Sequence, residues 1–258
     1  MRLPAALLLL PCLLEEPPPP KPPPPPPAAK VVAAIARAAR ENTALPPEKR
    51  VAGDALGNLY VRRAAAAAEG DARTFILGLE HALDPERTLA RLPLTAPALK
   101  GVETEEESKA RLRDLGKPTM RGRNDWLLHF TVSAALRVCG SEALAESAGI
   151  AKEATDAQAG TGFSFADLLA DLAGIRFAGW LLERDSAARL KRVAEGFAGE
   201  EFLPDPSKEP EGLKAAEFRE RFGSVTDERF IAKKRSMAEA VAALAVYRAE
   251  RDPGSGPK

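Results

Sequence analysis

The sequence is poor in the residues that support most alternatives to a helical fold. Aromatic residues make up 5% of its 258 residues, and it has only two cysteines and two histidines. Sheets are rich in aromatic and β-branched side chains, whereas alanine runs such as residues 64–68 favour helices. We therefore expect an all-α fold, a multi-helix bundle with short connections.

The chain also lacks an excess of charge of either sign. Lys plus Arg and Asp plus Glu both total 37, so the formal net charge is zero. Without a basic excess there is little to hold a phosphate backbone, and nucleic acid is not an expected partner. There is no Walker loop, dinucleotide fingerprint or zinc-binding cysteine pattern. Familiar nucleotide and zinc enzymes are therefore not indicated.

The N-terminus has the pattern of an export signal. Residues 1–16 begin with a positive charge and continue with an apolar stretch too short to span a bilayer, which needs about 20 residues. This pattern predicts a signal peptide or lipoprotein signal, and so a periplasmic or membrane-anchored bacterial protein. Cys12 invites comparison with a lipoprotein box, although such boxes have a small residue where Pro11 stands. The alternatives are membrane anchoring through a lipidated Cys12, or a cysteine removed with the signal peptide.

The rest of the chain divides into four expected segments. Residues 17–27 are almost all proline and predict a polyproline II linker, roughly 34 Å long at 3.1 Å per residue. A ligand for a proline-binding groove is the alternative. Residues 28–120 predict an N-terminal helical region, 121–202 a central helical domain with a polar cluster, and 203–258 a C-terminal loop and helices. Apolar periodicity places helices in the first of these regions at residues 31–41, 55–69 and 72–83.

Two polar features of the N-terminal region have simple structural interpretations. His81 is a lone histidine within a helical pattern, where such residues usually lie on the surface or are partly buried. The acidic run at residues 103–107 precedes Lys109, Arg111 and Arg113, which predicts a solvated helix carrying i,i+4 ion pairs. Neither feature is assigned a function.

The first helix of the central domain carries an acid and a histidine. Asn124 is a suitable N-cap for an apolar run over residues 125–139, and Gly140 is a suitable stop. Asp125 and His129 are four residues apart, so the carboxylate can orient the imidazole. Alternatively, Asp125 favours the positive end of the helix dipole and His129 is a satisfied core residue.

The second helix, over residues 141–158, carries Lys152, Glu153 and Asp156. Its two carboxylates are three residues apart, so they share a face. Such a pair can form half of a metal site or an acid/base pair. An ordinary charged surface helix explains the same spacing, and spacing alone favours that interpretation.

The third helix combines a cap with an acid on a small-residue stripe. Ser164 and Asp167 have the spacing of a capping box, so helix initiation can explain both. Asp171 shares a stripe with Gly174 and Ala178, whose small side chains let another helix approach closely. We therefore expect Asp171 to be enclosed, and an enclosed carboxylate needs a partner. The candidates are His129, Lys152, Arg176 and a bound cation.

These motifs follow one another in a fixed order: Asp-x-x-x-His from Asp125, Lys-Glu-x-x-Asp from Lys152, and Gly-Phe-Ser-Phe-x-Asp-Leu-x-x-Asp-x-x-Gly from Gly162. The order resembles a bacterial domain found in small periplasmic lipoproteins whose function is not established. More loosely, it is similar to the VanZ-like membrane proteins, although the helices here are less apolar. The resemblance covers roughly the central quarter of the chain. It implies a bacterial envelope protein with a polar cluster drawn from three helices, and no established reaction.

Two functional hypotheses follow. In the first, which the sequence favours, the protein is a non-enzymatic binding or structural module with a buried polar cluster. In the second, it is a metal-assisted or acid/base hydrolase acting on an envelope lipid or glycan, with a possible divalent metal as cofactor. The second predicts a cavity between the three helices. Its candidate catalytic residues are His129, Glu153, Asp156 and Asp171, its candidate metal ligands are His129, Glu153 and Asp156, and its candidate binding residues are Asp125, Lys152, Ser164 and Asp167.

Overall fold

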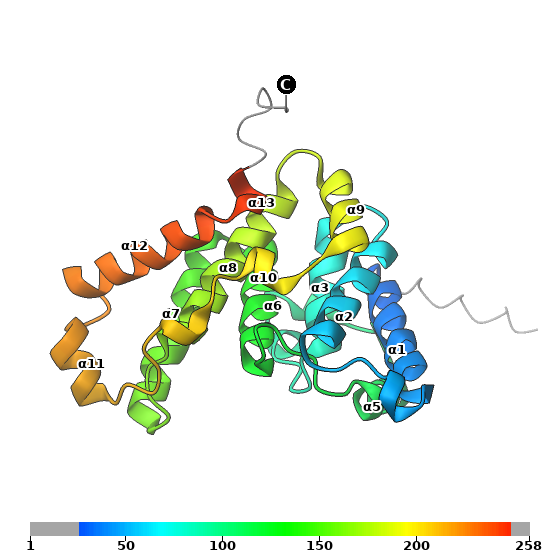
Figure 1. Ribbon diagram of the computed structural model, residues 1–258, viewed down its shortest axis with the longest axis horizontal. Coiled ribbons are helices and arrows are strands. Elements are labelled where there is room, and N and C mark those ends of the chain that lie inside the picture. The colour runs from blue at the N-terminus through cyan, green and yellow to red at the C-terminus, as the bar shows by residue number, and fades with distance from the viewer. Residues whose placement is uncertain (1–25, 249–258) are drawn as a thin grey trace, which may run out of the picture.

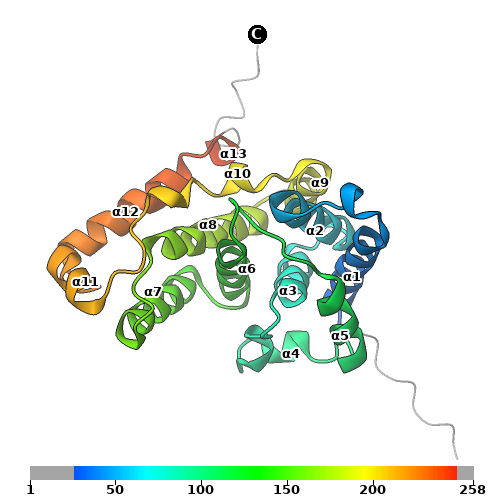
Figure 2. The same cartoon turned by 60° about the horizontal axis from the view of Figure 1, so that its bottom comes forward.

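The computed structural model describes residues 26–248, and this part of the chain is all-α (Figures 1 and 2). The described helices are α1 (Ala28–Ala44), α2 (Gly53–Ala67), α3 (Ala72–Leu83), α4 (Ala96–Leu99), α5 (Glu105–Asp114), α6 (Asn124–Cys139), α7 (Glu142–Ala159), α8 (Phe165–Leu182), α9 (Ser186–Gly196), α10 (Gly199–Phe202), α11 (Ala215–Phe222), α12 (Glu228–Ala242) and α13 (Ala245–Arg248), with short 3-10 turns η1 (Pro47–Lys49), η2 (Leu89–Arg91) and η3 (Pro206–Lys208). Within this range there is no strand, only isolated bridges. The expected all-α fold is confirmed for the described residues. The proposed signal segment, Cys12 and nearly all of the proline-rich linker lie outside them.

Helix α8 is the centre of the structure. It is apolar around most of its circumference, and a helix of that kind is buried by its neighbours on several sides. Helices α3, α6, α7, α9 and α12 all pack against it. Figure 2 shows α12 on one side of α8 and the α6–α7 pair on the other. Any polar residue of α8 that faces α6 or α7 is therefore enclosed between helices.

Helices α6 and α8 approach so closely that their backbones touch. A Cβ atom placed on Gly174 of α8 would lie 2.0 Å from the carbonyl oxygen of Phe130 on α6. Next to this contact the rings of Phe130 and Phe177 lie 5.2 Å apart between centroids. The close helix approach expected from the small-residue stripe is confirmed.

The N-terminal helices join this core through α3 and α2. Helix α3 packs on α1 on one side and on α6 on the other, and α2 packs on α9. The three helices expected here are present, and α3 has the expected bounds. Helices α1 and α2 each begin a few residues earlier than the apolar pattern suggested, at Ala28 and Gly53. Their first turns carry too few large apolar residues for periodicity to mark them.

The expected charged helix is present as α5, and Glu105 and Lys109 form an i,i+4 ion pair on it, but it is not solvated along its whole length. The Arg111 side chain is buried, and its Nη2 and Nε atoms donate to the Glu103 carboxylate at 2.7 and 3.0 Å. His81, which is also buried, lies 3.2 Å from the same carboxylate through Nε2. Burial alone would raise the pKa of Glu103, but hydrogen bonds from His81 and Arg111 lower it to about 2. This triad fastens α5 to the end of α3.

The start of α6 also differs from expectation, by one residue. The capping position belongs to Arg123, and Asn124 is already helical, with its side-chain amide donating to the carbonyl of Pro118 at 2.8 Å. Asn124 therefore anchors the incoming loop and does not cap the helix. Gly140 ends the helix as expected, and its amide donates to the carbonyl of Leu136.

The backbone contact between α6 and α8 can be tested with two glycines of the same helix. Gly174→Ala should destabilise the protein by about 2 kcal/mol, because the added methyl overpacks the contact with Phe130. Gly179→Ala is the matched control, since a Cβ there meets nothing within 4 Å. It should stabilise the protein by roughly 0.5–1 kcal/mol through helix propensity. Urea unfolding of both variants checks this, and equal effects would contradict the close contact.

Candidate functional site

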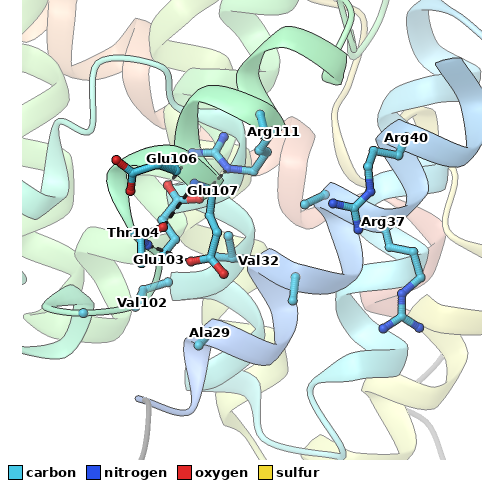
Figure 3. A pocket seen from close by; sticks show the side chains of 14 residues that line it. Ala29, Val32, Arg37, Arg40, Val102, Glu103, Thr104, Glu106, Glu107 and Arg111 are labelled. Carbon is cyan, nitrogen blue, oxygen red and sulfur yellow. Dashed lines mark hydrogen bonds and ion pairs between the residues drawn. The ribbon is translucent and has the colours of Figure 1, made fainter.

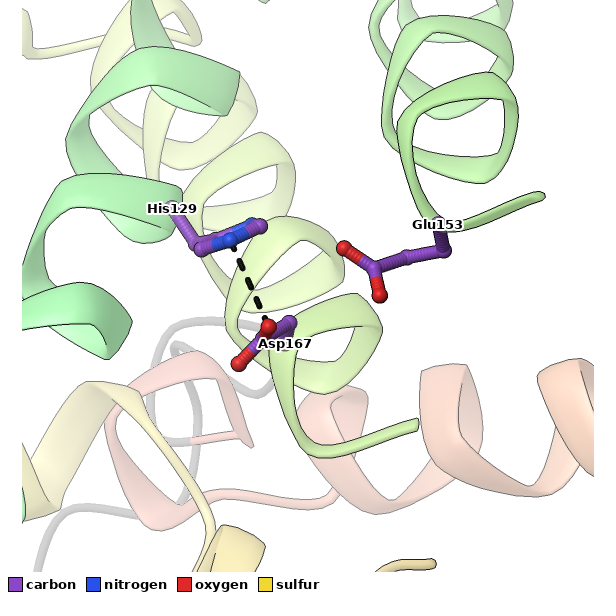
Figure 4. Close-up of side chains that lie close together, drawn as sticks. All are labelled: His129, Glu153 and Asp167. Atoms are coloured by element: carbon purple, nitrogen blue, oxygen red, sulfur yellow. Dashed lines mark ion pairs between the residues drawn. The ribbon is translucent and has the colours of Figure 1, made fainter. Parts of the chain in front are cut away.

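Five ionisable side chains from three helices meet on one side of α8. We call this group the polar cluster: His129 from α6, Lys152 and Glu153 from α7, and Asp167 and Asp171 from α8. Figure 4 shows the side chains of His129, Glu153 and Asp167 directed toward one another from separate helices. The three sequence motifs, far apart in the chain, therefore contribute to one place.

Asp171 holds the imidazole of His129 in one orientation. Nδ1 of His129 lies 3.0 Å from Oδ1 of Asp171, and the hydroxyl of Ser133 donates to the same oxygen at 2.7 Å. Because a carboxylate can only accept, Nδ1 is the protonated ring nitrogen. The other nitrogen, Nε2, then carries a free lone pair when the ring is neutral. The expected enclosure of Asp171 is confirmed, since it is 3% exposed.

The second oxygen of Asp171 rests against a glycine of α7. A Cβ atom on Gly149 would lie 2.5 Å from Oδ2 of Asp171, so only glycine leaves room for this carboxylate. Oδ2 is buried and has no hydrogen-bond partner. Gly149 is thus a residue on which the cluster depends.

Glu153 links α7 to the beginning of α8. It is 1% exposed, and its Oε2 accepts from the backbone amide of Ser164 at 2.9 Å while its Oε1 accepts from Lys152 at 3.0 Å. Burial raises the pKa of Glu153, and the nearby Lys152 ammonium offsets only part of that effect. Glu153 is therefore a buried acid that satisfies the N-cap residue of the next helix.

Because Glu153 accepts from the Ser164 amide, the Asp167 carboxylate is available for other contacts. The Ser164 hydroxyl caps α8 by accepting from the amide of Asp167 at 3.0 Å, as expected. In a full capping box the side chain of the residue three positions after the cap, here Asp167, accepts from the backbone amide of the cap residue. Here Glu153 already accepts from that amide. The Asp167 carboxylate instead lies 3.6 Å from Nε2 of His129 through Oδ2, and its buried Oδ1 has no hydrogen-bond partner. Helix initiation explains Ser164 but not the side chain of Asp167.

Two candidate residues each pair with a neighbouring cation. Asp125 does not orient His129: its carboxylate pairs with Arg123, whose Nε donates at 3.0 Å. Although burial raises the pKa of Asp125, this guanidinium lowers it below its usual value. Asp156 pairs with Lys152 at 2.8 Å on the more exposed side of α7. In both cases the cation lies within four residues of the carboxylate in the sequence.

The polar cluster carries an excess of negative charge. Its three carboxylates face one ammonium, that of Lys152, when His129 is neutral. Burial raises the pKa of Asp167, and the neighbouring His129 offsets that only in part. Burial alone would lower the pKa of His129, but the hydrogen bond and charge of Asp171, with the charge of Asp167, raise it. Each shift favours taking up a proton, as expected where enclosed negative charge lacks a cation.

The same groups have the arrangement of a metal site. His129, Glu153 and Asp167 each offer one ligand atom, and these atoms all lie within 4.8 Å of one another. Ligand atoms about 2.1 Å from a tetrahedral ion are about 3.4 Å apart, close to the 3.6 Å between Nε2 of His129 and Oδ2 of Asp167. Metal-bound histidines usually donate their other ring N–H to a carboxylate, which is the part Asp171 plays here. Asp167 thus stands in the position for which the sequence suggested Asp156.

A cavity of about 580 Å³ opens beside the polar cluster, between α6, α7 and the connection from α3 to α4. A second cavity, of about 650 Å³, lies between α1 and the start of α5 (Figure 3). There Arg37 and Arg40 project from α1, while Glu103 and Arg111 are already bound to each other. The first cavity is lined by His129, Lys152, Asp167 and Asp171 of the polar cluster, so it is the better candidate site.

Comparisons of the chain with protein-family models, curated proteins and solved structures found no match in any of the three. Among residues 26–248, no helix combines the length and apolar character needed to cross a membrane. The functional argument therefore rests on the geometry of the site.

The charge excess predicts how stability depends on pH. Asp167, Glu153 and His129 all have raised pKa values when folded, so the folded state binds more protons than the unfolded state and stability falls as pH rises through them. Asp167→Asn should remove part of this loss of stability. In EDTA at alkaline pH, the free energy of unfolding of the variant should therefore be about 1 kcal/mol higher than that of the wild type. Urea unfolding between about pH 5 and pH 9 checks this. A wild type that gains stability toward alkaline pH relative to the variant would contradict it.

Proposed function

We propose that this protein is an exported bacterial envelope protein whose polar cluster binds a divalent cation and uses it in a hydrolytic reaction. The observation that carries the proposal is the meeting of Nε2 of His129 with the carboxylates of Glu153 and Asp167, with Asp171 behind the ring and a cavity lined by His129 and Asp167 beside them. Export is supported by the signal-like residues 1–16 and the proline-rich segment after them. The resemblance to periplasmic lipoproteins and VanZ-like proteins points to the same compartment.

The balance of charge favours this hypothesis over a purely structural network. A network that only holds helices together is expected to be neutral and fully hydrogen-bonded, because each unpaired buried charge is costly. Here Oδ1 of Asp167 and Oδ2 of Asp171 are buried without partners, and one ammonium faces three carboxylates. A divalent cation would supply the missing positive charge.

The residues present suit metal-assisted hydrolysis. When bound, a divalent cation supplies a water of lowered pKa and polarises the bond to be cleaved. Three protein ligands leave one position open toward the cavity. Asp171 keeps the imidazole oriented, and the half-exposed Lys152 ammonium can donate a hydrogen bond to negative charge that develops on a substrate oxygen.

The structural module remains a second candidate because of one set of contacts. Within α7, Lys152 bonds to both Glu153 and Asp156. Glu153 accepts from the amide of Ser164, the N-cap residue of α8, so part of the group does hold α7 against α8. If this were its whole role, the protein would bind no cation and each substitution would only reduce stability.

Metal titration separates the two candidates. We expect the full chain, stripped with EDTA, to bind one Zn²⁺ or Mn²⁺ per molecule by calorimetry and to gain thermal stability on binding. Asp167→Asn should abolish this, and Asp171→Asn should weaken binding by about 10- to 100-fold, as loss of a carboxylate behind a ligating histidine does. Asp156→Asn is the matched control and should bind as the wild type.

Absence of metal binding would decide for the structural module. If the wild type binds no divalent cation while His129→Ala and Asp171→Asn lower the melting temperature, the polar cluster is a structural network. In that case the hydrolytic proposal fails.

A further inference from the structure

The cavity beside the polar cluster continues as a groove along one face of α6. Its lining residues on this helix recur at helical spacing from Asp125 through His129 to Leu136. At 1.5 Å per residue, this face extends for about 16 Å. The ionisable residues of α6, Asp125 and His129, lie in the first half of this face, and its apolar residues are Leu128, Val132 and Leu136. Ser133 also lines it, but its hydroxyl donates to Asp171.

The other walls show the same change from polar to apolar. Helix α7 contributes Lys152, a member of the polar cluster, and Ala148 one turn before it. The segment between α3 and α4 contributes Leu89, which is fully buried, and Leu92, which is partly exposed. The same segment also contributes Asp84, Glu86 and Thr88, and the Asp84 carboxylate accepts from the backbone amides of the other two. Beyond the polar cluster, all three walls therefore contribute aliphatic side chains, and these outnumber the polar ones.

Exposed leucines extend this apolar surface past the end of α6. Leu92, Leu94 and Leu144 are 38%, 48% and 43% exposed, although large aliphatic residues are usually buried. Leu94 and Leu144 lie together over Gly140, since a Cβ atom there would be 3.5 Å from the first and 2.5 Å from the second. A gathering of exposed leucines at the open end of an apolar groove is typical of a ligand-binding surface.

We infer that the substrate is an ester of a long-chain acid, a deduction that rests on the proposed hydrolytic function. The polar cluster binds the ester group, and the acyl chain lies along the α6 groove with its end toward the exposed leucines. Of the two envelope substrates considered from the sequence, a lipid fits this groove and a glycan does not. A glycan would require hydrogen-bonding side chains spread along the walls. Beyond the polar cluster, aliphatic side chains predominate here, and the carboxylate of Asp84, one of the polar residues in the wall, already accepts from two backbone amides.

The reaction is a simple hydrolysis. The oxygen of a water molecule bonds to the carbonyl carbon of the ester, and the bond from that carbon to the alkoxy oxygen breaks. One proton of the water goes to the departing alkoxy oxygen, which leaves as an alcohol. The other is released as the acid product ionises to a carboxylate, so no oxidant or further reactant is needed.

Chain length provides the test. Using the zinc-loaded full chain, we would measure calorimetric binding of octanoate, decanoate and dodecanoate, and hydrolysis of the p-nitrophenyl esters of the same acids. Affinity for the acids and kcat/KM for the esters should rise by up to about fourfold for each methylene that enters the groove. Val132→Asp and Leu94→Asp should flatten this dependence on chain length. Ile231→Asp, an exposed aliphatic residue of α12, is the matched control and should leave the dependence unchanged.

The outcomes separate failure of the acyl substrate from failure of the proposed metal-dependent hydrolysis. Zinc binding with no rise in affinity or rate with chain length overturns the acyl substrate and leaves the metal site standing. Chain-length-dependent binding without zinc binding or ester hydrolysis overturns the substrate role, and the groove is then a site for lipid binding alone. Leu94 lies at an exposed rim, so its variant remains informative if Val132→Asp does not fold.

Discussion

The close contact of α6 and α8 at Gly174 is the constraint on which the candidate site depends. Because the α8 backbone meets the carbonyl of Phe130, the neighbouring His129 on α6 is brought within hydrogen-bonding distance of Asp171, one turn before the glycine. At that separation no water layer fits between the helices, so the carboxylate must find its partner on the facing helix. The contact thereby determines which imidazole nitrogen is protonated and which faces the cavity.

A competition between two acids for one backbone amide decides the rest of the site. The backbone amide of Ser164 has no acceptor within its own helix at the start of α8, and both Glu153 and Asp167 could accept from it. Glu153 approaches from α7 and takes the amide, which leaves the Asp167 carboxylate turned toward His129. A bond that looks purely structural therefore frees a second carboxylate for the cavity.

The parts of the fold that were predictable are those that depend on local pattern. The bounds of α3, the Gly140 stop, the Ser164 cap and the enclosure of Asp171 beside small residues all follow from neighbours along the chain. Partner choice did not follow, because it depends on which helix lies opposite. Spacing joined His129 to Asp125, whereas Asp171 on the facing helix binds the imidazole and Arg123 pairs with Asp125. Spacing also placed Arg111 in solvent, whereas packing buries it against Glu103.

The same distinction bears on how the polar cluster should be interpreted. From the sequence each carboxylate had a local structural explanation, so a structural network was the simpler hypothesis. In the structure Asp156 pairs with Lys152, so an ordinary surface ion pair still explains it. Helix capping does not explain the Asp167 side chain, and Asp171 retains an oxygen without a hydrogen-bond partner. Proteins depart from consistency between local pattern and tertiary structure mainly where function requires it. The polar cluster is such a departure, because its three enclosed carboxylates lie next to an oriented imidazole and face only one ammonium. This imbalance of charge favours a bound cation, and it is stronger evidence than the spacing of any one pair of residues in the sequence.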